Sequence, residues 1–222
     1  MLETLAPARR TILGVANNHA ADGGPRASAE HCRFLEQRSF EVIGSRDRPS
    51  GTINDTVQIT SCSFWSNLPC DYVATPQSIA RESAGDRGFR ILFAHWGYEM
   101  QLHPKPRQIQ VANDFLRSWN AIVGHHPHCP QPIVEQRGRL AAYSPGNVLF
   151  GVNNAKWHHG LVLKIQIGPD SAGRWSVGQV DWSFTCRTPI GDNLFQVDTV
   201  PHCRWFPEVP AKQPSHSSRT RP

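Results

Sequence analysis

The 222-residue chain lacks several patterns that would assign a protein to a class at once. It has no Cys-x-x-Cys pair among its six cysteines, which excludes a zinc ribbon, and it has no internal repeat. No stretch of about 18 apolar residues occurs, so no segment is expected to span a membrane. The N-terminal residues contain no apolar run of the length that a secretory signal peptide needs. Localisation therefore stays unknown at this stage.

The chain also has only a small excess of positive charge. Its 23 basic and 18 acidic residues give a net charge of +5, without a dense run of lysine or arginine. We therefore expect a solvated basic surface and no nucleic-acid partner. The cysteines are scattered along a chain without a signal peptide, and we expect them to be free thiols.

The length and the hydrophobic content of 39% are sufficient for a large globular domain. We place this domain at residues 1–208. Residues 209–222 are rich in proline, serine and basic side chains, and we expect a disordered tail there.

Apolar runs and helical periodicity alternate along the first part of the chain, whereas the second part is rich in strands. The expected strands lie at residues 11–16, 56–64, 89–94, 121–123, 139–150, 161–167 and 175–184. The expected helices lie at residues 28–40, with Ser28 as N-cap, 75–82 and 108–120. This order predicts an α/β fold in which helices cover two packed sheets.

Polar motifs follow three of the expected strands directly. Asn18-His19 follows the first strand, His95 follows the strand at 89–94, and three histidines within VGHHPHCPQP follow the strand at 121–123. Because the carboxyl ends of parallel strands meet at one edge of a sheet, we expect the three motifs to converge on one site. Taken singly, the first motif is also typical of a turn, and a lone histidine is typical of a protein core.

The motifs VANNHAADGG, FAHWGYE, VGHHPHCPQPI and AAYSPGNVLFG occur in this order between residues 10 and 167. Together they resemble the CapA/PgsA family of capsule and poly-γ-glutamate biosynthesis proteins, which is similar to the calcineurin-like metallophosphoesterases. The resemblance implies a metallophosphoesterase-like four-layer α/β/β/α sandwich with a metal centre at one edge of the sheets.

The resemblance also implies roles for individual residues. His19 would be the general acid that protonates a leaving oxygen. The metal ligands would be Asn18, His95, His126 and His128. Residues that would contact substrate or support the ligands are Asp22, Glu99, His125 and Asn147. Of these, Glu99 would contact either the metal or the substrate. Such a donor set suits a divalent ion of Mn, Zn or Fe, and a histidine can transfer a proton near neutral pH.

The chain departs from the family pattern before Asn18. The family places a Gly-Asp motif and a further acidic segment upstream, and only 17 residues precede Asn18 here. We therefore expect the first strand or strands of the sheet to be missing, together with the carboxylates that would neutralise two metal ions. One ion, held by His95, His126 and His128, is expected rather than two. Either the start codon is misplaced or the chain is a gene fragment, which the intact downstream motifs favour, or the chain is a truly shortened and inactive relative.

Three functional hypotheses follow. The first is a CapA-type protein with a metal-dependent hydrolase-like site that acts on an anionic polymer or a phosphate-containing substrate, with membrane synthase subunits as partners. The second is a non-catalytic subunit that binds polymer or partners in a synthesis and export complex. The third is a mononuclear metal-binding domain.

Overall fold

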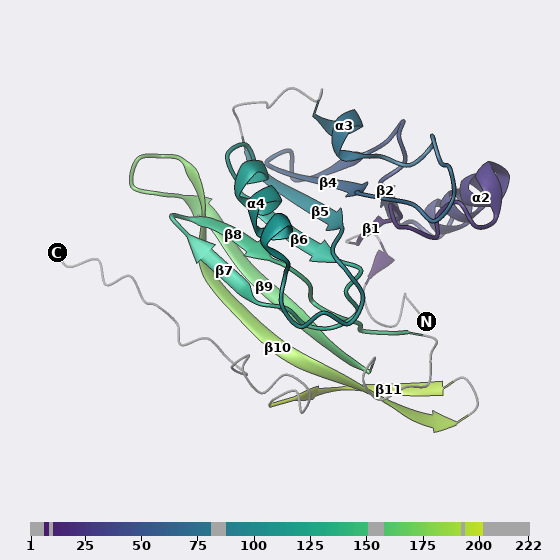
Figure 1. Cartoon of the computed structure of the whole chain (residues 1–222). Coiled ribbons are helices and arrows are strands. Elements are labelled where there is room, and N and C mark those ends of the chain that lie inside the picture. The colour runs from purple at the N-terminus through teal and green to yellow at the C-terminus, as the bar shows by residue number, and fades with distance from the viewer. Residues whose placement is uncertain (1–6, 9–10, 81–87, 151–157, 192–193, 202–222) are drawn as a thin grey trace. The chain divides into compact units, whose positions relative to one another are not determined.

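The computed structural model of the chain describes residues 7–8, 11–80, 88–150, 158–191 and 194–201 (Figure 1). The chain divides into two compact units, Met1–Trp96 and Gly97–Pro222. The predicted domain at residues 1–208 stays a prediction, and the expected tail at 209–222 lies outside the described residues. No helix in the described part is long and apolar enough to cross a membrane.

Unit 1 combines short parallel strands with helices. Its elements are β1 (Ile12–Gly14), α2 (Gly24–Glu36), β2 (Glu41–Ile43), β3 (Ser50–Ile53), β4 (Val57–Ser63), α3 (Pro76–Ile79) and β5 (Phe89–His95). β1 and β2 pair in parallel, and α2 connects them as the crossover of a βαβ unit. β4 pairs in parallel with β5, and β3 pairs with β4 in the antiparallel direction.

The packing of unit 1 follows from its apolar residues. Leu35 on α2 is buried with Phe40 and Val42, which fixes the helix against the strand that follows it. The register of β4 and β5 pairs Ser63 with His95, so both strands end at the same level. The loops that leave these two strands therefore begin side by side.

Unit 2 is rich in strands. Its elements are α4 (Pro106–Phe115), β6 (Ala121–His125), β7 (Ile133–Gln136), β8 (Arg139–Ala142), β9 (His159–Pro169), β10 (Trp175–Gly191) and β11 (Leu194–Val200). β6 pairs in parallel with β8, which is also joined to β7 as a hairpin. β9, β10 and β11 form an antiparallel sheet, in which β9 and β10 are the long green strands of Figure 1.

The predicted α/β class is confirmed, and the expected strands at 11–16, 56–64, 89–94, 121–123, 161–167 and 175–184 correspond to β1, β4, β5, β6, β9 and β10. The predicted start of the first helix is wrong. The helix begins at Gly24 rather than at Ser28, with Gly23 as N-cap, because Pro25 suits the first turn and lacks the amide hydrogen that a helix start leaves unpaired.

Three other boundaries differ. The strand expected at 139–150 ends at Ala142, and the SPGN turn follows soon after it. The helix expected at 108–120 lies at Pro106–Phe115. The helix expected at 75–82 is described over Pro76–Ile79, where the Thr75 hydroxyl accepts a hydrogen bond from the Ser78 amide, and residues 81–82 lie outside the described part. The described cysteines are free thiols, as expected: Cys32, Cys62, Cys70, Cys129 and Cys186.

Candidate functional site

Three candidate metal ligands converge in unit 2. Glu99, His126 and His128 each place one ligand atom within 4.8 Å of the other two. His126 is buried, His128 is half-buried and Glu99 is exposed, so the group has one side open to solvent. Tetrahedral ligands bound at about 2.1 Å stand about 3.4 Å apart, so these atoms would need to approach by at most about 1.4 Å to hold an ion. One carboxylate with two imidazoles suits Zn, Mn or Fe.

The backbone of the His-Pro-His segment is held in an unusual conformation. His126 has φ of 98° and His128 has φ of 59°, both in the left-handed region. Such residues typically cost about 1–3 kcal/mol each unless the surroundings impose the conformation. The buried Pro127 lies between them, and the two imidazole centroids are 5.9 Å apart. The fold thus supports a strained loop that presents two imidazoles together.

Glu99 is attached to the same loop by long-range hydrogen bonds. The backbone amide of Met100 donates to the carbonyl of Pro127 at 2.8 Å. The carbonyl of Gln101 accepts a bond from the side-chain Nε2 of Gln131 at 2.7 Å. These bonds hold the segment after Glu99 against the histidine loop and explain why the carboxylate lies beside the imidazoles.

Asn147 determines which ring nitrogen of His128 carries the hydrogen. Its Nδ2 donates to the backbone carbonyl of His128 at 3.2 Å, so its Oδ1 faces the Nδ1 atom of the His128 ring at 2.9 Å. An amide oxygen can only accept, and Nδ1 must therefore carry the hydrogen of the neutral ring. The lone pair then lies on Nε2, where a metal can bind, as in metal sites whose histidines donate their other ring hydrogen.

His125 is the last residue of β6, and the group formed by Glu99, His126 and His128 does not include it. Its Nε2 atom is inaccessible to solvent. Burial lowers the pKa of His125 to about 3, and the neighbouring His126 and His128 add to this shift. His125 is therefore neutral at pH 7.

In unit 1, the Asn-His motif forms a turn stabilised by its own side chains. Asn17 Oδ1 accepts a hydrogen bond from the His19 backbone amide at 2.9 Å. The Nδ1 atom of the exposed His19 ring donates to the carboxylate of Asp22 at 2.7 Å. This bond orients the imidazole and leaves Nε2 available for proton transfer. The role of His19 as general acid stays a prediction.

Asn18 and His95, both buried, are brought together by a backbone contact. The amide of Asn18 donates to Nε2 of His95 at 3.1 Å, so this lone pair is already engaged. A metal could bind His95 at Nε2 only if that hydrogen bond opened. The contact fits the simpler interpretation of His95 as a core histidine, and the ligand roles of Asn18 and His95 stay predictions.

Asn67 is a site residue that the sequence motifs do not include. Its Oδ1 accepts a bond from Nδ2 of Asn18 at 3.2 Å, and its backbone amide donates to the Asn18 carbonyl at 3.0 Å. Its side-chain Nδ2 also lies 3.2 Å from Nδ1 of His19. Asn67 lies just after the end of β4, and the HWGYE motif begins at the end of β5. The expectation that polar residues at strand ends form the site could therefore have identified Asn67.

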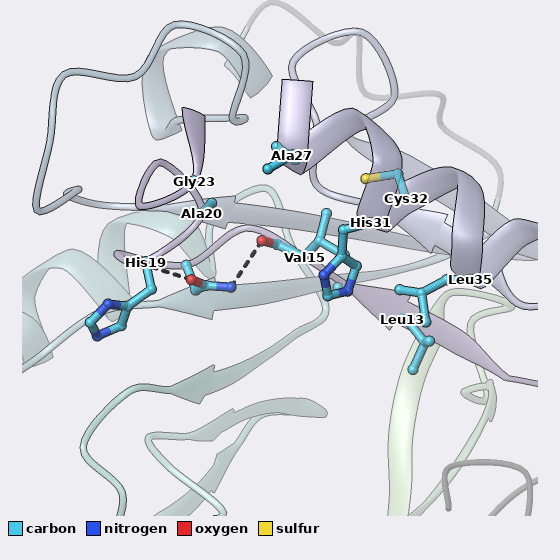
Figure 2. Close-up of a pocket in the computed structure, with 12 residues that line it drawn as sticks. Leu13, Val15, His19, Ala20, Gly23, Ala27, His31, Cys32 and Leu35 are labelled. Atoms are coloured by element: carbon cyan, nitrogen blue, oxygen red, sulfur yellow. Dashed lines mark hydrogen bonds between the residues drawn. The ribbon is translucent and has the colours of Figure 1, made fainter. Parts of the chain in front are cut away.

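A pocket of about 480 Å³ lies beside this turn, between α2 and β1 (Figure 2). Leu13, Val15 and Leu35 make part of its wall apolar. Cys32 also lines it, and burial together with Glu36 raises the pKa of this thiol. Figure 2 shows the imidazole of His19 directed away from the side chains of α2. The pocket therefore adjoins the Asn-His turn, and His19 is among its lining residues.

Comparison with known proteins gives matches in sequence. Residues 65–152 match the family model of the bacterial capsule synthesis protein PGA_cap. The chain is 24% identical over 211 residues to the PGA biosynthesis protein CapA of Bacillus subtilis strain 168, covering 86% of this chain and 56% of that protein. It is 24% identical over 164 residues to the capsule biosynthesis protein CapA of Bacillus anthracis, covering 63% and 40%. The chain thus spans about half the length of these relatives.

Two solved structures are similar over 90% of this chain. One is a hypothetical protein from Thermus thermophilus, with 14% identity, a TM-score of 0.45 and 79% of that chain covered. The other is a novel phosphatase from Mycoplasma pneumoniae, with 12% identity, a TM-score of 0.37 and 84% of that chain covered.

The family match includes both the motif that begins at His95 and the loop that carries His126 and His128. The two matched relatives both carry the name CapA. The motifs seen in the sequence agree with these matches. Over these residues the chain is similar to the CapA/PgsA family of bacterial capsule synthesis proteins.

Proposed function

We propose that this chain binds one divalent metal ion at Glu99, His126 and His128 and uses it to hydrolyse a bond in an anionic polymer or a phosphate-containing substrate. The convergence of these three side chains is the observation that supports the proposal most directly. The relatives' names, which refer to PGA and capsule biosynthesis, support an anionic polymer as substrate. Mn, Zn or Fe is the metal that this donor set favours.

The charge of the ligand group favours one ion over two. Glu99 supplies one negative charge, and the two histidines are neutral when they bind a metal. A second +2 ion close by would meet strong repulsion without a carboxylate to offset it. Glu99 thus replaces His95 in the ligand set that the sequence predicted, and the set becomes two histidines with one glutamate, an arrangement found in catalytic zinc sites.

Several residues of the chain have defined tasks in this proposal. A bound divalent ion would polarise the substrate oxygen and activate a water for attack. Asn147 keeps the lone pair of His128 on Nε2, and the Met100–Pro127 hydrogen bond keeps Glu99 beside the ring. In unit 1, the Asp22 carboxylate holds Nδ1 of His19, which leaves Nε2 for the proton-donor role that the family resemblance implies.

A second candidate function is a non-catalytic subunit that binds polymer or membrane synthase partners, and it agrees with a His95 that holds no metal. The Nε2 atom of His95 accepts the amide hydrogen of Asn18, which keeps a predicted ligand away from metal binding. In this case the fold of the site would be maintained for binding rather than for turnover.

Metal content and hydrolysis, measured on the same preparation, test the proposal. The whole chain is loaded with Mn²⁺ or Zn²⁺ and assayed with a phosphodiester and with poly-γ-glutamate. We expect His126→Ala to lose the metal, and His19→Ala to keep it while turnover falls by about 10²-fold or more. His31→Ala, an exposed histidine on α2, is the matched control.

The three hypotheses give different results in this experiment. Bound metal with turnover that depends on His19 favours the hydrolase. Bound metal without turnover favours a mononuclear binding domain, and the absence of both favours the non-catalytic subunit. Either of the last two results contradicts the hydrolytic proposal.

A further inference from the structure

Unit 2 has a second hollow, lined by arginines. It has a volume of about 680 Å³, and its arginines come from three turns: Arg117 after α4, Arg137 and Arg139 at the β7–β8 turn, and Arg174 at the β9–β10 turn. Among its described lining residues, Asp170 is the one carboxylate. We call this hollow the arginine pocket.

The arginine pocket is separate from the candidate metal centre. β6 runs from Ala121 to His125. Asn120, which lines the pocket, precedes the strand, and His126 follows it. At 3.3 Å per residue, the two positions lie roughly 20 Å apart along the strand. The two sites therefore occupy opposite ends of β6.

Hydrogen bonds between the turns hold the walls of the pocket together. Asn120 Nδ2 donates to the Trp175 carbonyl at 2.9 Å, and the Val177 amide donates to the Gly138 carbonyl at 2.8 Å. Arg137 and Gly138 form the two-residue turn of the hairpin, with φ of 54° and 73°, as in a type I′ turn. The arginines of this hairpin are thus fixed in position at their backbone.

Two of the four arginines are already paired with a carboxylate of the protein. Arg174 binds Oδ2 of Asp170 through Nε at 3.1 Å and Nη2 at 3.0 Å. Arg117 lies 3.5 Å from a carboxylate oxygen of Asp114.

The other two arginines stay available. Within the described residues, no carboxylate pairs with Arg137 or Arg139. Glu135, in the same hairpin, accepts the Gly138 amide hydrogen at 2.9 Å. Arg137 and Arg139 can therefore receive an anion, for which the planar guanidinium offers paired hydrogen bonds.

The remaining polar lining indicates what kind of anion fits. Asn113 and Gln136 line the pocket with carboxamides, which both donate and accept hydrogen bonds. A chain that alternates carboxylates with amide bonds would match guanidinium groups beside carboxamides. We propose that the arginine pocket binds a segment of a polycarboxylate chain with an amide backbone, such as polyglutamate. The choice of polymer rests on the proposed function, whereas the anion-binding site does not.

Binding to poly-γ-glutamate, measured in EDTA, tests this inference on the whole chain. A labelled short oligomer is titrated by fluorescence anisotropy against the wild type and against the Arg137→Gln/Arg139→Gln double variant. We expect the double variant to bind about tenfold more weakly or worse, because it loses charge-assisted hydrogen bonds. Its affinity should also depend less on salt. Lys164→Gln, an exposed residue of β9 outside the pocket, should bind like the wild type.

Three outcomes would overturn the inference. The first is that the wild type does not bind the oligomer. The second is that the arginine double variant binds with unchanged affinity while its thermal unfolding matches the wild type. The third is that Lys164→Gln loses as much affinity as the double variant. The assignment to an amide polymer is tested with polyphosphate and with the Asn113→Ala/Gln136→Ala double variant. It would be overturned if polyphosphate bound as tightly as polyglutamate and the double variant bound both polymers like the wild type. Because EDTA removes metals, these results are independent of the metal centre, and loss of hydrolysis with retained binding would count against the proposed function alone.

Discussion

At the scale of single residues, the chemistry of the candidate metal centre depends on which nitrogen of His128 carries the proton. The two hydrogen bonds to Asn147 decide this, since the amide nitrogen is committed to the backbone carbonyl and its oxygen faces Nδ1. The left-handed backbone at His126 and His128 adds strain that only the folded loop can support. Neither feature involves a charge, yet both determine where the ligand atoms lie.

Replacement of Asn147 should weaken metal binding. Asn147→Leu removes the acceptor that keeps the proton on Nδ1 of His128, and we expect the affinity for Zn²⁺ or Mn²⁺ to fall about 10–100-fold in calorimetric titration. Asn147→Asp keeps an acceptor for Nδ1 and should retain most of the affinity. Equal affinities in the wild type and Asn147→Leu would show that Asn147 does not position the ligand.

A buried histidine should make stability depend on pH. Burial lowers the pKa of His159 from its usual 6.5, the neighbouring His158 adds to this shift, and a hydrogen bond with the Thr185 backbone opposes it. Below pH 6.5 the unfolded chain therefore takes up a proton that folded His159 resists. The free energy of unfolding should then fall with falling pH, by up to about 1.4 kcal/mol per pH unit from this group.

Urea unfolding of His159→Gln at neutral and at mildly acidic pH measures this contribution. The variant should lose less stability on acidification than the wild type. His31→Gln, which changes an exposed histidine of α2, should keep the wild-type dependence. Identical pH dependence in the wild type and His159→Gln would contradict the assignment.

At the scale of elements, the turn that carries Asn147 packs tightly against β9 and the histidine loop. Gly146 has φ of 68°, and a Cβ atom there would lie 2.8 Å from the carbonyl oxygen of His159 and 2.8 Å from Cδ of Pro130. Asn147 also donates its amide hydrogen to the His159 carbonyl. The glycine thus allows the backbone approach that brings Asn147 to His128.

Gly146→Ala should destabilise the protein more than an alanine at another left-handed glycine. Gly173 has φ of 77°, and a Cβ atom there would have no neighbouring atom within 4 Å, so Gly173→Ala should lose only about 1–2 kcal/mol from the backbone. Gly146→Ala adds steric overlap, which typically costs about 1–3 kcal/mol more. Urea midpoints compare the two variants, and equal losses would contradict the packing described for this turn.

Sequence patterns identified most of the longer elements, and the site in part. β5 and β6 were predicted because short apolar runs mark buried strands, and β4 was predicted from a loose alternation of apolar and polar residues. β2, β3 and β7 were not predicted, since three or four residues give little periodicity. The seven-residue β11 was not predicted either. The partnership of Glu99 with the histidine loop depends on the Met100–Pro127 hydrogen bond, which no local pattern contains. The motif gave Glu99 a possible contact with the metal but could not separate it from substrate binding.

At the scale of the whole molecule, the family resemblance and the proposed site rest on different observations. The similarity to capsule synthesis proteins rests on sequence matches that include the motifs at His95 and at His126–His128. The proposed site depends on three side chains within unit 2 and on the loops that hold them. A ligand set of two histidines and one glutamate predicts a single ion, in contrast to the two-metal centre that the family resemblance suggests.

Metal titration of the purified chain tests this central proposal most directly. Isothermal titration with Zn²⁺ or Mn²⁺ should give one ion per chain for the wild type. Glu99→Gln and His126→Ala should each remove measurable binding, whereas His31→Ala should leave it unchanged. Two ions per chain in the wild type, or unaltered binding in Glu99→Gln and His126→Ala, would contradict the proposed site.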